Sequence, residues 1–259
     1  MLAVVTGASS GIGAEFARKL ASRGFDLTLV ARREDRLRAI AAEVSALHHV
    51  RAEALPADLI QDADRSRAAD HIRSATDLGL LVNNAGFGIP GFFVRTEPDA
   101  QERMHRLHIL ATMLLTHAAL SNLVPKARSG TGVINVSSVA GFAATPGSVT
   151  YGATKAWMNA FTSGLAEELA ALKSPVRVQA LCPGFTLTEF QDVLKTDRSQ
   201  VPRALWLTPD FVVRESLRAF DRGQTIVIPD WRYKAIARFM RIAPQSWLRR
   251  AARRRSTAK

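Results

Sequence analysis

The chain has 259 residues, of which 47% are hydrophobic and 22% are charged, as in globular proteins large enough to bury a substantial core. A single cysteine, Cys182, excludes an internal disulfide framework and a cysteine-based zinc site, and it suits a reducing compartment. No apolar stretch reaches the roughly 20 residues that cross a bilayer. The first apolar run, residues 2–5, leads into a glycine-rich turn instead of a signal-peptide pattern, so we expect a cytoplasmic protein.

The net charge of +12 is concentrated at the end of the sequence. Residues 232–259 contain ten lysines and arginines and no acidic residue, and subtracting these ten leaves +2 for residues 1–231. The basicity is therefore a property of the C-terminal tail. We expect no nucleic-acid partner, because no fold signal for one accompanies the charge.

Strand-like and helix-like segments alternate along residues 1–230. We assign strands to residues 2–5, 26–31, 50–55, 79–82, 132–136, 176–182 and 224–228. The first of them is a continuous apolar run, typical of a strand buried on both faces of a parallel sheet. Helical periodicity occurs between them, at residues 14–22, 33–47, 64–75, 101–126, 151–172 and 209–220. This order predicts an α/β fold with a doubly wound parallel sheet and helices on both faces. We predict one domain over residues 1–230, followed by a basic helix and tail over residues 231–259.

A glycine-rich turn, Thr6-Gly7-Ala8-Ser9-Ser10-Gly11-Ile12-Gly13, joins the first strand to the first helix. Small residues let the backbone approach a pyrophosphate, and the helix N-terminus supplies free N–H groups and a positive dipole. The spacing differs from the more usual Gly-x-Gly-x-x-Gly dinucleotide fingerprint. We assign cofactor binding to Gly7, Ser9, Ser10, Gly11, Ile12 and Gly13. The alternative is a merely tight turn.

Two arginines, Arg32 and Arg33, follow the second strand. An acid at this place would bind the 2′-hydroxyl of NAD, whereas an arginine accommodates the 2′-phosphate of NADP. A guanidinium suits a phosphate in geometry as well as charge. We therefore favour NADP(H) over NAD(H), the alternative being that both arginines simply begin a solvated helix.

Three residues near the fifth strand carry the expected chemistry. Ser138 ends that strand, and Tyr151 and Lys155 are four residues apart in a predicted helix, which places phenol and ammonium on one face. A nearby cation favours the phenolate and lowers its pKa toward the range of a general acid or base. Tyr-x-x-x-Lys alone also fits a surface aromatic beside a solvated lysine.

With these motifs assembled, residues 2–230 resemble the short-chain dehydrogenase/reductase family. Residues 6–13 match its cofactor turn, residues 83–86 its Asn-Asn-Ala-Gly segment, and Ser138, Tyr151 and Lys155 its catalytic residues. The resemblance implies a Rossmann-like fold and NAD(P)-dependent hydride transfer between a carbonyl and an alcohol. It implies that Tyr151 protonates the oxygen, that Ser138 orients it, and that Lys155 binds the nicotinamide ribose. It extends the cofactor contacts to Asp58, Leu59, Asn84, Ala85, Gly86, Tyr151, Lys155, Pro183, Gly184, Thr186 and Thr188; no metal is expected.

One position departs from the family pattern. The family usually has an asparagine in the long helix before the Ser138 strand, where it holds a water of a proton relay; here the position is His108. His108 either fills the asparagine space as a satisfied core side chain, or joins the relay and makes activity sensitive near pH ~6–7. A third alternative is impaired turnover.

Six phenylalanines fall in segments expected around the pocket mouth, which favours an apolar carbonyl or alcohol substrate over a sugar. They are Phe87, Phe92, Phe93, Phe142, Phe185 and Phe190. The alternative is that most of them belong to the core.

The tail has two interpretations. Ile236, Phe239 and Met240 recur at helical spacing among basic residues, which is typical of a helix lying on an anionic membrane surface. The alternative is packing of residues 231–248 over the pocket or a partner subunit. The resemblance implies a homodimer or homotetramer through helices 101–126 and 151–172. Besides the enzyme, we keep open an NADP-binding regulatory or scaffold protein that acts through the tail.

Overall fold

A computed structural model describes residues 1–193 and 201–242. Its centre is a parallel sheet in the order β3-β2-β1-β4-β5-β6-β7. The strands are β1 (Leu2–Thr6), β2 (Asp26–Ala31), β3 (Ala52–Pro56), β4 (Leu78–Asn83), β5 (Gly132–Val136), β6 (Arg177–Leu181) and β7 (Ile226–Val227). The doubly wound α/β fold predicted from the sequence is confirmed.

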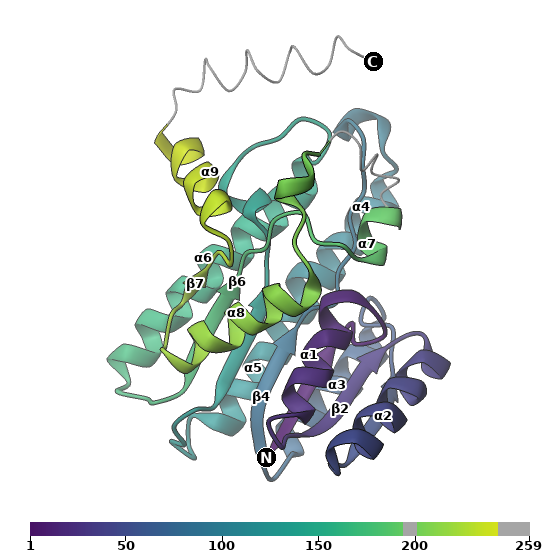
Figure 1. Cartoon of the computed structure of the whole chain (residues 1–259), viewed down its shortest axis with the longest axis vertical. Helices are drawn as coiled ribbons and strands as arrows, with labels where there is room; N and C mark the ends of the chain where they lie inside the picture. The colour runs from purple at the N-terminus through teal and green to yellow at the C-terminus, as the bar shows by residue number, and fades with distance from the viewer. Residues whose placement is uncertain (194–200, 243–259) are drawn as a thin grey trace.

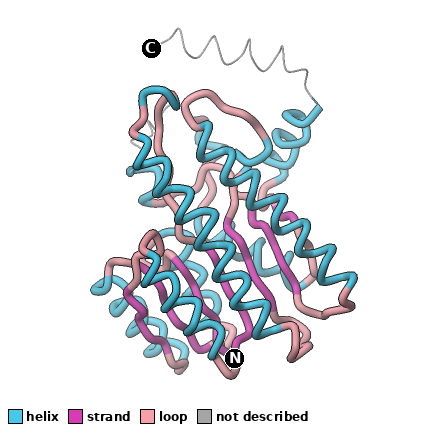
Figure 2. Tube along the Cα trace, turned by 180° about the vertical axis from the view of Figure 1, so that it is seen from behind, coloured by secondary structure: helices cyan, strands magenta, loops and turns pink. Residues whose placement is uncertain are grey.

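Helices cover both faces of the sheet (Figures 1 and 2). On one face α1 (Gly11–Ala21), α2 (Glu34–His48) and α8 (Pro209–Asp221) bury residues such as Phe16, Leu37 and Leu217. On the other, α3 (Asp62–Ser74), α5 (Thr112–Leu123) and α6 (Val149–Ala171) bury Ile72, Leu115 and Leu169. Apolar side chains on both faces explain why β1 and β4 are nearly continuous hydrophobic runs.

The carboxyl ends of the strands all point to the edge drawn at the top of Figure 1. The short helices gather there: η1 (Phe93–Arg95), α4 (Pro98–His105), η3 (Val139–Phe142), α7 (Glu189–Val193), η5 (Arg203–Leu205) and α9 (Trp231–Ile242). In doubly wound sheets ligands bind beyond this edge, and the predicted site residues converge on it.

The long helix predicted over residues 101–126 begins earlier and is interrupted. It comprises α4, a π-helical turn η2 (Arg106–Ala111), and α5. A π turn accommodates one extra residue in the helical ladder and re-aims a side chain, and His108 lies in this turn. Helical periodicity could not reveal the interruption, because the apolar pattern continues through it.

One other boundary differs from expectation. The last strand is reduced to Ile226–Val227, which pairs with the end of β6. The basic helix expected from residue 231 corresponds to α9, in which Tyr233 and Ala237 are buried; Ala243 and the rest of the tail lie outside the described residues. Among the helices that the structure describes, none is long and apolar enough to cross a membrane.

Candidate active site

The glycine-rich turn connects β1 to α1 with its backbone in conformations that favour glycine. Gly7 and Gly11 have φ values of 64° and 56°. A Cβ on Gly13 would collide with the carbonyl oxygen of Gly7, so the third glycine is required for close packing of helix and turn. The N-cap residue Ser10 makes no capping bond with its own side chain, and N–H groups at a helix N-terminus can bind an anion. The turn thus fits a dinucleotide pyrophosphate.

The ends of β1 and β4 are tied together beneath this turn. Thr6 Oγ1 accepts from the N–H groups of Asn84 at 2.9 Å and Ala85 at 3.0 Å, and donates to Val82 O. Asn84 Nδ2 donates to the carbonyl oxygens of Thr6 and Gly7. The Asn-Asn-Ala-Gly segment therefore shapes the floor of the turn. Asp58 lies at the end of β3, where its carboxylate accepts from Ile60 N at 3.2 Å.

Arg33 reaches across the turn from the end of β2. Its guanidinium donates to Ser9 Oγ at 2.9 and 3.1 Å and to Ser10 Oγ at 2.8 Å, with Arg32 exposed beside it. Two hydroxyls and a guanidinium meeting at one point fit a phosphate. Glu189 of α7 also lies here, with one carboxylate oxygen on Arg33 at 2.8 Å and the other on Arg36 at 2.6 Å. The hydrogen bond from Arg33 is the largest cause that lowers the Glu189 pKa.

The structure brings Ser138, Tyr151 and Lys155 together at the ends of β5 and α6. Ser138 caps η3 by accepting from Ala140 N at 3.1 Å. Lys155 is 5% exposed and donates to Val136 O at 2.8 Å. Its Nζ lies 5.7 Å from the centre of the Tyr151 ring, consistent with the expected four-residue spacing on one helix face.

The ionisation of this cluster differs from the sequence-based expectation. Burial raises the pKa of the Tyr151 phenol to about 12, although the hydrogen-bonded Ser138 side chain opposes this. Burial also lowers the pKa of Lys155 to about 8. Desolvation disfavours both charged forms, and here it outweighs the attraction between ammonium and phenolate. In the protein alone, Tyr151 is a protonated phenol at neutral pH.

His108 is fully buried and both of its ring nitrogens are hydrogen-bonded. Nε2 accepts from Phe87 N at 3.1 Å, so the proton of the neutral ring is assigned to Nδ1, which donates to Thr154 Oγ1 at 2.9 Å. Thr154 Oγ1 donates in turn to Tyr151 O. Burial, followed by the Lys155 charge, holds the His108 pKa well below 6.5. The expected sensitivity near pH 6–7 is therefore not supported.

The loop after β6 is held by a residue that the sequence did not suggest. Pro183 is buried, and Gly184 lies against the Tyr233 ring so closely that a Cβ there would collide with it. Tyr233 Oη accepts from Phe185 N at 3.0 Å and donates to Leu205 O at 2.7 Å. No local pattern signals this role, because Tyr233 is 48 residues from Phe185 along the chain.

The same loop reaches back to the glycine-rich turn. Thr186 Oγ1 donates to Gly184 O at 3.0 Å, and Thr188 lies where a Cβ on Gly11 would be in tight contact. The predicted nicotinamide loop and the predicted pyrophosphate turn are therefore neighbours. The segments that follow β1, β4, β5 and β6 therefore lie together at one edge of the sheet.

Aromatic rings surround Tyr151. Phe190 lies 5.9 Å from the Tyr151 ring centre, and Phe87 lies 6.1 Å from that of His108. None of the six phenylalanines singled out in the sequence is buried in the core. The alternative that they are core residues is wrong.

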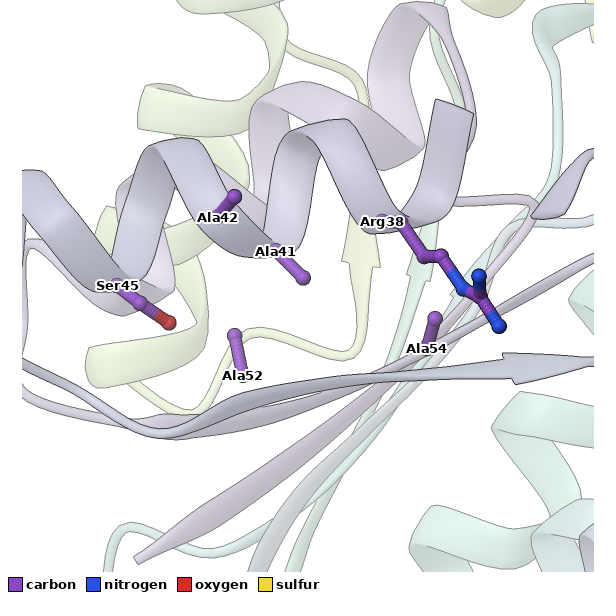
Figure 3. A pocket seen from close by; sticks show the side chains of 6 residues that line it. All are labelled: Arg38, Ala41, Ala42, Ser45, Ala52 and Ala54. Carbon is purple, nitrogen blue, oxygen red and sulfur yellow. The ribbon is translucent and has the colours of Figure 1, made fainter. Parts of the chain in front are cut away.

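A surface depression elsewhere carries no such chemistry. It lies between α2 and the edge strand β3 (Figure 3) and is lined by Arg38, Ala41, Ala42, Ser45, Ala52 and Ala54. None of the predicted site residues borders it. Over the described parts of the chain, no cluster of three or more His, Cys, Asp or Glu side chains could hold a metal ion.

Comparison with known proteins shows the family to which the chain belongs. The family model described as short chain dehydrogenase matches residues 1–199. The 3-oxoacyl-(acyl-carrier-protein) reductase FabG of Aquifex aeolicus (strain VF5) is 32% identical over 217 residues, covering 82% of this chain and 86% of that protein. The very-long-chain 3-oxoacyl-CoA reductase of Laccaria bicolor is 34% identical over 219 residues, covering 83% of this chain and 62% of that protein, so the chain spans less than two thirds of its length.

Solved structures of dehydrogenases are also similar to this chain. A short-chain dehydrogenase from Sphingobium yanoikuyae in complex with NADPH superposes with a TM-score of 0.84 at 36% identity, covering 91% of each chain. The bulky-bulky ketone specific alcohol dehydrogenase from Comamonas testosteroni superposes with a TM-score of 0.79 at 30% identity, covering 99% of this chain and 93% of that one. The chain belongs to the short-chain dehydrogenase/reductase family and is an NAD(P)-dependent oxidoreductase.

Proposed function

We propose that the protein transfers a hydride between NADP(H) and a carbonyl or secondary alcohol of an apolar substrate, with Tyr151 as the general acid and base. The observation that carries this proposal is the meeting of Ser138, Tyr151 and Lys155 at the carboxyl edge of the sheet, the same edge from which the glycine-rich turn leaves β1. When bound, the nicotinamide supplies or accepts the hydride. The protein positions the reacting groups, and Tyr151 donates or accepts the proton.

Tyr151 is protonated at neutral pH, so its phenol is ready to give a proton to a carbonyl oxygen during reduction. The Ser138 side chain, which interacts with the phenol, is placed to donate to the same oxygen. Lys155 stays near the ring from its anchor on Val136 O. As the carbonyl is reduced, the Lys155 ammonium stabilises the phenolate that remains.

Arg33 with Ser9 and Ser10 supports a preference for NADP(H). The Arg33 guanidinium lies 2.8–3.1 Å from the two hydroxyls, and no acid follows β2 at the place where one would bind the 2′-hydroxyl of NAD. The Sphingobium relative was solved with NADPH.

The half-buried Phe190 beside Tyr151 and the half-buried Phe87 beside His108 support an apolar substrate. Relatives named for 3-oxoacyl groups and for bulky ketones are consistent with this class. A ketone bearing two bulky apolar groups is therefore the first compound to test.

The decisive experiment is NADPH oxidation over a panel of aliphatic, steroid-like and 3-oxoacyl ketones and aldehydes, with NADH run in parallel. We expect turnover with the apolar members and a higher kcat/KM with NADPH. Binding of NADPH without turnover of any compound would instead favour the regulatory or scaffold alternative.

The assembly that we propose follows from exposed apolar side chains. Leu110, Met113 and Leu114 are exposed along η2 and α5, which supports a homodimer or homotetramer through the long helices; light scattering tests it. The single Cys182 supports the cytoplasmic location that we propose. Ile236 and Phe239 are exposed on α9, which supports peripheral membrane contact. Equal sedimentation with anionic vesicles of the full chain and of a chain ending at Ala243 would reject that contact.

A further inference from the structure

A carboxylate stands in the site to which we assign the cofactor phosphate. Glu189 bridges Arg33 and Arg36, with one oxygen on each guanidinium. Arg33 also donates to Ser9 and Ser10, so its donors are shared between the two hydroxyls and the carboxylate. A phosphate that binds Arg33 would meet the Glu189 charge at the same guanidinium.

We propose that Glu189 is a specificity-determining residue that competes with the 2′-phosphate for Arg33 and so restrains the preference for NADP(H) over NAD(H). The inference rests on the proposed function. It concerns a residue of α7, 156 positions from Arg33, on a segment whose preceding residue, Thr188, lies over Gly11.

Two features make the competition specific to the phosphate. Glu189 contacts the arginines beyond β2, whereas the residue of this segment that lies against Gly11 of the pyrophosphate turn is the neutral Thr188. Both oxygens of the carboxylate are engaged by arginines. A ligand without a 2′-phosphate does not compete with the Glu189 carboxylate, because such a ligand brings no charged group to Arg33.

The test is calorimetric titration with two fragments, 2′,5′-ADP and 5′-AMP, into wild type and Glu189→Gln. The variant keeps the side-chain size and removes the charge. Removing the carboxylate charge weakens its hold on the Arg33 guanidinium, and because an exposed ion pair is weak we expect only about five-fold tighter binding of 2′,5′-ADP. Binding of 5′-AMP should stay within about two-fold of wild type, since no charge is relieved.

Two variants distinguish an effect of the Glu189–Arg33 contact from a general effect of removing one negative charge. Glu34→Gln removes a carboxylate one residue from Arg33, but Glu34 pairs with Arg38 at 2.5 Å; it should give little gain. In an Arg33→Gln background, Glu189→Gln should give no gain, because the shared partner is absent.

An equal gain in Glu34→Gln, or a gain that persists without Arg33, would overturn the proposal. So would unchanged or weaker binding of 2′,5′-ADP by Glu189→Gln while wild type binds both fragments. If wild type binds neither fragment, the proposed cofactor site itself fails, and this inference with it.

Discussion

The two ends of the predicted cofactor site differ in how far their ionisable side chains are exposed to water. At the catalytic end, Lys155 and His108 are buried among apolar and hydroxyl groups, and burial moves their pKa values away from the charged forms. At the adenosine end, the Arg33, Arg36 and Glu189 side chains are 43%, 51% and 47% exposed and form ion pairs. A charge costs little where water reaches it and much where water is excluded. We therefore expect substitutions at the catalytic end to change activity or stability strongly, and substitutions at the adenosine end to change cofactor affinity by small factors.

Tyr151→Phe should give the largest effect. Without the phenol no group at the site delivers the proton, and we expect kcat to fall about 10³-fold, while NADPH affinity stays near wild type. Steady-state NADPH oxidation and NADPH fluorescence titration measure the two quantities. A variant that retains more than a tenth of the wild-type kcat would remove Tyr151 from the proposed role.

Lys155→Met tests the burial of charge through stability. The pKa of Lys155 is lowered to about 8 by burial, below its ordinary value. Below pH 8 the folded protein must therefore bury the charged ammonium, which lowers its free energy of unfolding. This loss of stability disappears as the pH rises towards 10.5. Relative to the variant, wild type should gain roughly 3 kcal/mol of unfolding free energy between pH 7 and pH 10.5.

Urea denaturation of both proteins across this range measures the difference. Ionisation of Tyr151, whose pKa is raised, lowers stability above pH 10 in both proteins and cancels. A difference in unfolding free energy that is constant with pH would mean that Lys155 keeps its ordinary pKa in the folded protein.

Tyr233→Phe probes the link between α9 and the loop after β6, and its effect should be intermediate. The lost hydroxyl leaves Phe185 N and Leu205 O without their partner, which should cost about 1–2 kcal/mol of stability. We expect KM for the cofactor to rise about three-fold with a smaller change in kcat, because the loop is displaced but the proton donor is intact. Trp231→Phe, at an exposed position of the same helix, is the control and should match wild type. A fall in kcat at unchanged KM would contradict a positioning role for Tyr233.

Sequence reasoning reached those parts of the site that depend on local pattern. The alternation of apolar runs and helical periodicity predicted the parallel sheet, and the glycine spacing at Gly7, Gly11 and Gly13 predicted a turn that the backbone angles support. Lys155 lies beside Tyr151 as the helical spacing required. Each of these features is set within a few residues of chain.

The features that could not be predicted from the sequence depend on contacts between distant segments. Glu189 meets Arg33 across 156 residues, and Tyr233 meets Phe185 across 48; no periodicity encodes either pair. The pKa of Tyr151 was misjudged for a related reason. Spacing reveals a neighbouring cation, but the extent of burial, which here has the larger effect, emerges only from the packed structure.

His108→Asn should have the smallest effect on the pH dependence of activity. The ring is neutral, its pKa is held well below 6.5 by burial, and both nitrogens have partners in Phe87 N and Thr154 Oγ1. We expect kcat/KM to fall by no more than about ten-fold, through the loss of one of these hydrogen bonds, with the pH–rate profile unchanged in shape between pH 5.5 and 8, a test window set around the ordinary histidine pKa of ~6.5. A wild-type inflection near pH ~6–7 that vanishes in His108→Asn would instead assign His108 to a titrating proton relay. Identical profiles would leave it as the side chain that holds Phe87 and, through Thr154, the first turn of the helix that carries Tyr151.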